Sequence, residues 1–175
     1  RHLYEDPDGR IWVSSRMGGG LSSVEAGSGR VTRYLPEPGR SGAISSNRIT
    51  CTVADGKGHL YVGTENGGLE VLDLASKRFR RYAPRRGDDR SLSSPSVYSL
   101  AHDDQGILWV GTYNGGVSYT SEAQRRFARI GATREDELSD PHVASVLLDR
   151  RGALWVGTAG GGLPRLRPGA RRMEV

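Results

Sequence analysis

Apolar and polar positions alternate along this chain in short runs, a pattern that predicts β structure. The stretches "VYSLAHD" and "HVASVLLD" place apolar side chains at the period of a half-buried strand. Such runs lead into Asp-x-x-Gly, which favours a tight turn because the Asp side chain bonds the backbone two residues on and glycine tolerates positive φ. A second run such as "ILWVGT" follows, then Gly-Gly and a third strand. We expect units of four short antiparallel strands and no helix.

The unit recurs four times. Aromatic residues mark equivalent positions 46 to 49 residues apart, at Trp12, Tyr61, Trp109 and Trp155. A second marker, an apolar residue before Ser-Ser or Ser-Asp, recurs between them at Ile44, Leu92 and Leu138. Four antiparallel strands in about 40 to 50 residues is the size of one propeller blade. We therefore predict an all-β fold of about four β-propeller blades, over residues 1–48, 49–96, 97–141 and 142–175.

The tryptophan rings and the Gly-Gly pairs have different structural roles in such a blade. We expect Trp109 and Trp155 to wedge between neighbouring sheets, with Val110 and Val156 on the opposite sheet face. The Gly-Gly pair that follows lets the chain reverse with positive φ where a Cβ would clash. A phosphate-binding loop would need a strand-to-helix junction and a Lys-Ser/Thr ending, and the sequence has neither.

Composition narrows the function classes. The chain has 25 glycines in 175 residues and one cysteine, Cys51, which we expect to be a small core residue. Its 25 basic residues are scattered through loops and strand ends beside 20 acidic ones, so we do not expect nucleic-acid binding. No apolar run reaches the ~18 residues of a membrane span. The chain starts on a polar segment without Met, and we expect it to belong to a longer protein.

With these repeats the chain resembles the two-component regulator propeller family. Repeats of that family read Asp-x-x-Gly, an apolar-Trp-Val-Gly-Thr stretch, Gly-Gly-Leu, a strand and a connection ending in Leu-Ser-Ser-Asn. Here "DDQGILWVGTYNGGV" with "LSDPHVAS", and "GHLYVGTENGGL" with "LSSPSVYS", follow the pattern, and the resemblance covers the entire chain. The first repeat departs from it with Ser14 and Ser15 in place of Gly-Thr, and the second has Tyr61 in place of Trp.

The resemblance implies the periplasmic or extracytoplasmic sensor portion of a membrane-spanning bacterial signalling protein, usually a hybrid histidine kinase and sometimes a diguanylate cyclase. Such a sensor binds a ligand and passes the signal to an intracellular output domain, so we expect no catalysis by this segment itself. Family members commonly carry two seven-bladed rings and a small β-sandwich. Four blades would then be a fragment, with open edges available for further blades or for self-association.

No residue set in the sequence indicates catalysis or metal binding. The four histidines are scattered, no Cys/His cluster has ligand spacing, and the Asp residues lack the ladder of a calcium loop. A Gly-x-Ser-x-Gly elbow is absent from the sequence. We expect no catalytic residue, no metal and no cofactor.

The turn between the second and third strands of each blade is the candidate binding site. Propellers gather these turns on one face, where residues can vary on a constant frame. Arg, Asn and Tyr there suit an anionic or hydroxyl-rich ligand such as an oligosaccharide, because guanidinium groups pair with carboxylate or sulfate and a ring stacks on a sugar. The candidate residues are Arg16, Met17, Glu65, Asn66, Tyr113 and Asn114, with Arg86 and Arg134 at the rim.

Two other functions stay open at this point. A protein-interaction scaffold would use the same tyrosine and arginines as anchors against a partner. A propeller lyase, similar to the streptogramin-inactivating enzymes, would need two histidines that converge on one face.

Overall fold

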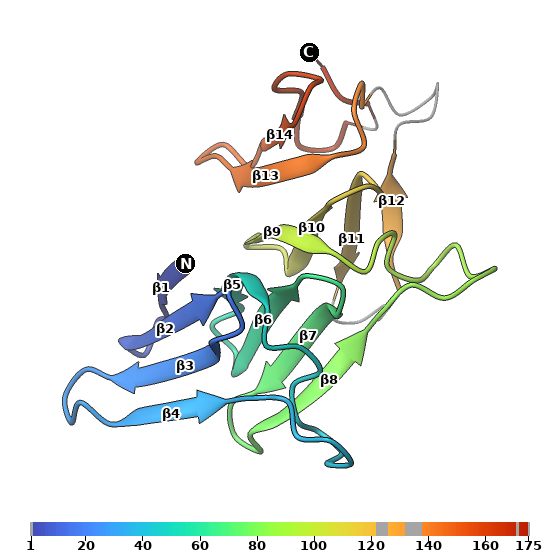
Figure 1. Cartoon of the computed structure of the whole chain (residues 1–175). Helices are drawn as coiled ribbons and strands as arrows, with labels where there is room; N and C mark the ends of the chain where they lie inside the picture. Colours follow the sequence, from blue (N-terminus) through green and yellow to red (C-terminus); the bar gives the residue numbers. More distant parts are fainter. Residues whose placement is uncertain (1, 122–125, 132–137, 171, 175) are drawn as a thin grey trace.

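The computed structural model describes residues 2–121, 126–131, 138–170 and 172–174 (Figure 1). Within these residues the chain forms β-strands and no helix, so the described part contains no helical segment that could cross a membrane. The strands are β1 (His2–Glu5), β2 (Arg10–Ser15), β3 (Gly20–Glu25), β4 (Val31–Tyr34), β5 (Ile49–Ala54), β6 (His59–Thr64), β7 (Gly68–Asp73), β8 (Arg78–Tyr82), β9 (Val97–His102), β10 (Ile107–Thr112), β11 (Val117–Ser121), β12 (Ala128–Ile130), β13 (Val143–Leu148), β14 (Leu154–Thr158) and β15 (Arg165–Leu166).

Sequence neighbours pair to form four antiparallel sheets. The strand orders are β1-β2-β3-β4, β5-β6-β7-β8, β9-β10-β11-β12 and β13-β14-β15, and these sheets are called blades 1 to 4 below. In blade 4 an isolated bridge between Arg165 and Glu174 stands in the place of a full outer strand. The predicted all-β architecture of propeller blades is confirmed.

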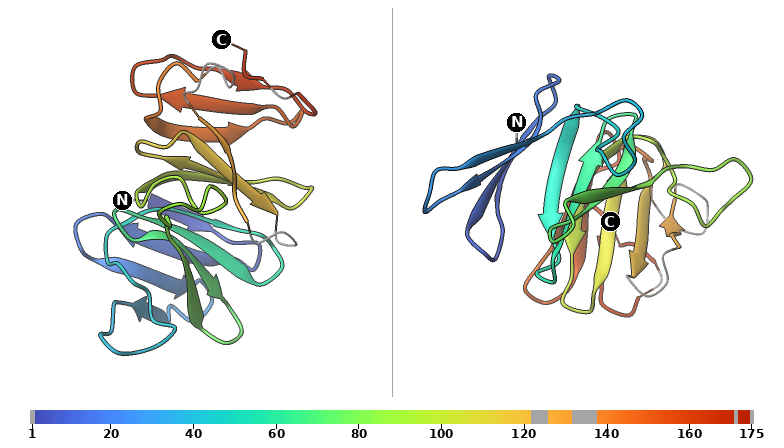
Figure 2. Two further views of the ribbon diagram at one scale, coloured as in Figure 1. Left: turned by 90° about the vertical axis from the view of Figure 1, so that its right-hand side faces the viewer. Right: turned by 90° about the horizontal axis from the view of Figure 1, so that it is seen from below.

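The blades pack face to face in chain order. Figure 2 shows the sheets following one another from the blue end to the red end, with the first strand of each beside the first strand of the next. Three apolar clusters fill the spaces between successive blades. The second repeat marker supplies one buried residue to each cluster: Ile44, Leu92 and Leu138.

The aromatic marker of each blade faces the following blade, and the residue after it faces the preceding one. Trp109 belongs to the cluster between blades 3 and 4, whereas Val110 belongs to the cluster between blades 2 and 3. The predicted wedge is confirmed for Trp109, which is buried. The predicted wedge is wrong for Trp155. Its ring also points away from the preceding blade, but no described sheet covers it, so it stays partly exposed with the Arg165 guanidinium 5.2 Å from its ring centre.

The Asp of the Asp-x-x-Gly turn also accepts a hydrogen bond from the aromatic marker where that residue is Trp. The Asp6 carboxylate accepts hydrogen bonds from the backbone N–H groups of Asp8 and Arg10 and, at 2.8 Å, from the indole nitrogen of Trp12. The same bond joins Asp103 to Trp109 and Asp149 to Trp155, at 3.1 and 2.9 Å. The turn therefore satisfies a donor that burial would otherwise leave unpaired.

The Gly-Gly turns are bonded to the connection that follows each blade. The last glycine of three of these turns donates its N–H to a carbonyl of the connection: Gly20 to Asn47, Gly68 to Pro95 and Gly116 to Pro141. At Gly116, where φ is +68°, a Cβ would collide with the carbonyl oxygen of Ile130. This confirms the expected role of the glycine pair and explains why the two repeat markers keep one period.

Small residues let the blades approach closely beside the inner strands. A Cβ at Gly63 would collide with the Cys51 sulfur within blade 2 and with Val97 of blade 3. Cys51 is 6% exposed, as expected for a core residue, and burial raises the pKa of its thiol to about 12. The thiol is therefore protonated, and packs as a small apolar group.

One carboxylate is buried in blade 2. Glu70 in β7 is 1% exposed and accepts a 3.0 Å hydrogen bond from the backbone N–H of Ser45. Burial raises the pKa of Glu70, although the bond to Ser45 and the charge of Arg81 act in the opposite direction. The corresponding residue in blade 3 is the buried Ser118, which bonds Ser93 of its own connection.

Replacing Asp6 by Ala should lower the free energy of unfolding by about 2–4 kcal/mol, because the buried Trp12 indole and two backbone N–H groups lose their acceptor. Urea unfolding followed by tryptophan fluorescence measures this. Asp8→Ala, two residues away on an exposed side chain, is the control and should stay within about 0.5 kcal/mol of the parent. Equal losses in the two variants would contradict the anchoring role.

Replacing Glu70 by Gln should change the free energy of unfolding relative to the parent chain in a pH-dependent way. The difference should favour the variant more at pH 7 than at pH 4. The folded-state pKa of Glu70 is raised, so the parent loses stability as pH rises from about 4.3, the ordinary value, through the folded value. Gln cannot titrate and keeps an oxygen for the Ser45 N–H. Urea midpoints between pH 4 and pH 8 test this against the exposed control Glu5→Gln, and a pH-independent difference for Glu70→Gln would refute it.

Candidate ligand-binding site

Turns and connections from all four blades meet on one face, called the turn face below. It carries the turn between the second and third strands of each blade and the connection that enters each blade. Backbone hydrogen bonds fix the two together within a blade, from Glu65 N–H to the Arg48 carbonyl at 3.0 Å and from Tyr113 N–H to the Ser96 carbonyl at 2.9 Å. The same bond in blade 4 joins Ala159 to His142.

A continuous row of side chains crosses the turn face and is called the aromatic row. The Arg16 guanidinium of blade 1 lies 5.1 Å from the ring centre of Tyr98 in blade 3. Tyr98 contacts Tyr113 at 5.4 Å between centroids, and Tyr113 meets the His142 ring edge-on at 4.8 Å. His142 Nδ1 lies 3.0 Å from a carboxylate oxygen of Asp140. The row joins blades 1, 3 and 4 without a gap.

Charged groups flank the row. The Glu65 carboxylate of blade 2 lies 2.9 Å from Arg48 Nη2 and 3.9 Å from Arg16 Nη2, so it holds both guanidinium groups beside the row. At the far end the backbone N–H of His142 lowers the pKa of Asp140, helped by the His142 side chain and by Gly160 N–H. The lowered pKa keeps Asp140 ionised at neutral pH, and both carboxylates set the positions of their partners.

The row keeps open surface for a ligand. Half of the Arg16 side chain is exposed, and Tyr113 is 47% exposed. A cation held over one ring leaves its outward N–H groups free to bind an anion, and an exposed ring face offers a stacking surface. Such a surface can take a ligand that combines flat apolar faces with acidic or hydroxyl groups.

The structure brings together only part of the predicted site. Arg16, Glu65 and Tyr113 belong to the row and its flank. Asn66 instead serves the turn: its φ is +63°, and its side-chain oxygen and backbone N–H both bond the hydroxyl of Ser96.

No ring or ion-pair contact among the described residues joins the other predicted residues to the row. Met17 is 94% exposed, and Asn114 is also exposed. Arg86 is exposed in the connection between β8 and β9, and no contact among the described residues links it to the row. Arg134 lies outside the described residues.

Four members of the site were missed from the sequence: Arg48, Tyr98, Asp140 and His142. Arg48 and His142 occupy the same repeat position, just before the first strand of blades 2 and 4, where blade 3 has Ser96. Variation at a position so close to the constant Ser-Ser segment was the available signal.

The described residues hold no group of three or more His, Cys, Asp or Glu side chains placed to bind a metal ion. His59 and His102 lie at the end of their blades opposite the turn face. His142 is therefore not joined there by either of them.

Comparison with known proteins bears on the fold and the family. Four segments match the family described as Two component regulator propeller: residues 1–17, 43–66, 91–114 and 137–160, together about half of the chain. No curated protein matches the chain.

Solved structures show the same fold. The extracellular domain of a protein described as a hybrid two-component system from B. thetaiotaomicron superposes with a TM-score of 0.85 at 21% identity, covering 98% of this chain and 24% of that one. A second such domain from the same organism gives 0.78 at 23% identity, covering 99% and 23%. The chain thus spans about a quarter of each. Virginiamycin B lyase from Staphylococcus aureus gives 0.64 at 15% identity, covering 94% and 54%.

Proposed function

Because the chain belongs to the two-component regulator propeller family, we propose that it is an extracytoplasmic ligand-sensing segment of a bacterial signalling receptor. In this proposal the turn face binds the ligand, and an intracellular output domain elsewhere in the full protein receives the signal. Similarity to extracellular domains of two-component systems, of which this chain covers about a quarter, supports that placement.

The observation that carries the proposal is the aromatic row. Its members come from positions far apart in the sequence, yet they meet in one line across three blades. A ligand lying along the row would contact blades 1, 3 and 4 together and favour one relative position of those blades. Differential binding of this kind is what a sensor needs in order to shift a conformational equilibrium.

The chemistry of the row favours an acidic oligosaccharide. Sugar rings present flat apolar faces that stack on tyrosine, and uronate or sulfate groups pair with guanidinium groups such as those of Arg16 and Arg48. Asp140 and Glu65 offer acceptors for sugar hydroxyls at the two ends. A purely cationic ligand would meet the two arginines and is disfavoured.

The uncovered face of blade 4 supports the proposal that this chain forms part of a longer propeller. Trp155 occupies the position that in blades 1 and 3 is covered by the next sheet, and Leu147 of the same blade is 64% exposed. A further blade, or a second copy of the chain, would cover these groups.

Binding to uronate-containing and neutral oligosaccharides of equal length, measured by isothermal titration calorimetry, tests the ligand proposal. We expect the acidic series to bind more tightly. Tyr113→Ala and Arg16→Ala should each weaken binding about tenfold, which corresponds to one lost stacking or ionic contact of about 1.4 kcal/mol. Tyr113→Phe keeps the ring and should bind within about twofold of the parent.

Arg151→Ala is the matched control, because Arg151 is an exposed arginine in the turn between β13 and β14, at the opposite end of the blade. It should leave affinity unchanged. Equal affinities in the parent, Arg16→Ala and Tyr113→Ala would refute the turn-face site. Failure of every sugar, together with a protein partner whose binding is lost in these two variants, would favour the scaffold function instead.

A further inference from the structure

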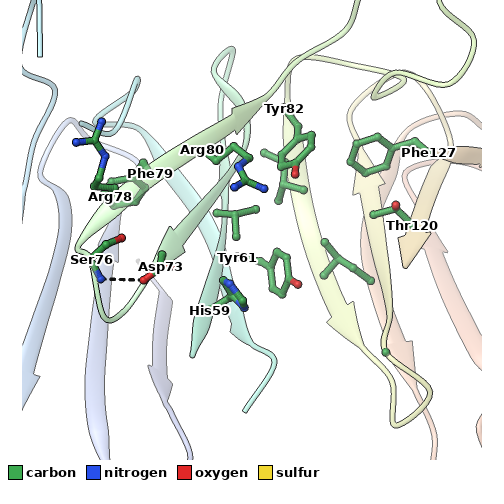
Figure 3. Close-up of a pocket in the computed structure, with 14 residues that line it drawn as sticks. His59, Tyr61, Asp73, Ser76, Arg78, Phe79, Arg80, Tyr82, Thr120 and Phe127 are labelled. Atoms are coloured by element: carbon green, nitrogen blue, oxygen red, sulfur yellow. Dashed lines mark hydrogen bonds between the residues drawn. The ribbon is translucent and has the colours of Figure 1, made fainter. Parts of the chain in front are cut away.

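A hollow of about 390 Å³ opens between blades 2 and 3, away from the turn face. Its walls come from β6, β7 and β8 on one side and from β10, β11 and Phe127 on the other (Figure 3). Three aromatic rings contribute to the lining, those of Tyr61, Tyr82 and Phe127. Phe79 also borders the hollow, but its ring contacts Tyr34 between blades 1 and 2. This volume is within the range of small-molecule sites, about 300–1,000 Å³.

The hollow occupies, between blades 2 and 3, the place that Trp12 fills between blades 1 and 2. Between blades 1 and 2, Trp12 is fully buried and stacks on Tyr34 with centroids 6.0 Å apart, and Tyr34 meets Phe79 edge-on. The same positions between blades 2 and 3 are Tyr61, Tyr82 and Phe127.

The match follows from the sheet register. Tyr34 pairs with Leu21, and Tyr82 pairs with Leu69. Both leucines directly follow the last glycine of the turn in their blade. Tyr82 and Phe127 keep their edge-on contact at 5.9 Å. A phenol ring is smaller than an indole, and Tyr61 stacks on His102 of blade 3 at 5.9 Å. Tyr61, in the place of a tryptophan, thus leaves space between walls that otherwise have the same kinds of residue as the first interface.

A cation is directed into this space. Figure 3 shows the Arg80 side chain reaching from β8 toward the gap between Tyr61 and Tyr82. Among the described residues no hydrogen bond or ion pair holds its guanidinium. The neighbouring charged groups are occupied, since Arg78 bonds the Ser41 hydroxyl at 3.0 Å and Asp73 accepts the backbone N–H groups of Ala75 and Ser76.

We propose that this hollow, named the interblade pocket, binds an aromatic carboxylate, with the ring system between Tyr61 and Phe127 and the carboxylate on Arg80. The rings of the walls offer edge and face contacts to a flat ligand. A guanidinium pairs with a carboxylate in a fork geometry. The site is separate from the turn face and does not depend on the function proposed for it.

The test uses 2-naphthoate as the probe and 2-naphthylmethanol as its uncharged counterpart, with dissociation constants from ligand-observed NMR titration of the 175-residue chain. The parent should prefer the acid. Arg80→Gln should weaken the acid about tenfold and leave the alcohol within about twofold, because only the ionic contact is lost. Arg30→Gln, an exposed arginine between β3 and β4 of blade 1, should change neither.

Tyr61→Trp should fill the pocket as Trp12 fills the first interface, and so abolish binding of both probes without lowering the thermal midpoint. Tyr61→Phe keeps the space and should bind both. If Tyr61→Trp does not fold, the proposal is tested by Arg80→Gln alone, through the ratio of the dissociation constants of the acid and the alcohol. Unchanged acid binding in Arg80→Gln, or unchanged binding of both probes in a folded Tyr61→Trp, overturns the proposal.

Tyr113→Ala separates this site from the turn face. It should weaken oligosaccharide binding about tenfold while naphthoate binding stays at the parent level. Loss of naphthoate in this variant would place the probe on the aromatic row and contradict the interblade pocket.

Discussion

Burial of one sheet against the next is the interaction on which this structure depends. A four-stranded sheet has two faces and cannot remove either from water by itself, so each blade needs a neighbour. The chain meets this need by sending alternate residues to opposite neighbours: Trp109 faces blade 4 and Val110 faces blade 2. The apolar clusters therefore lie between the blades, and each has one wall from each sheet.

Polar groups are placed so that the indole and turn N–H donors buried in the repeated frame find acceptors. The Asp of each turn serves the indole where the blade has Trp, and in blade 2 Asp55 pairs with His59 Nδ1 at 2.8 Å. Glycine N–H groups bond the connection that leads into the next blade. These constant residues carry the frame, which leaves the remaining turn positions free to vary. Arg16 and Tyr113 are variable turn residues of this kind, and the frame sets them beside Tyr98 of β9.

The two proposed sites arise from different departures from the repeat. On the turn face, variable residues sit on an intact frame, and the row they form is exposed. In the interblade pocket the frame itself changes, because Tyr61 replaces the larger ring that fills the first interface. A ligand there would lie between two blades and would stabilise their contact in proportion to its occupancy. A ligand on the turn face would bridge three blades instead.

The sequence by itself determined the blade architecture, the role of the glycine pairs and the burial of Cys51, because these follow from a period of two, a period of about 48 residues and local turn chemistry. It also placed Arg16, Glu65 and Tyr113 on one face. Only the tertiary structure showed that Asn66 is bound by its own turn and that Tyr98 and His142 complete the row. Side chains more than 80 residues apart, such as Arg16 and Tyr98, meet through the angle between blades, and no local pattern encodes that angle. The pocket beside Tyr61 depends on the same geometry, since the space left by a smaller ring exists only once two sheets face each other.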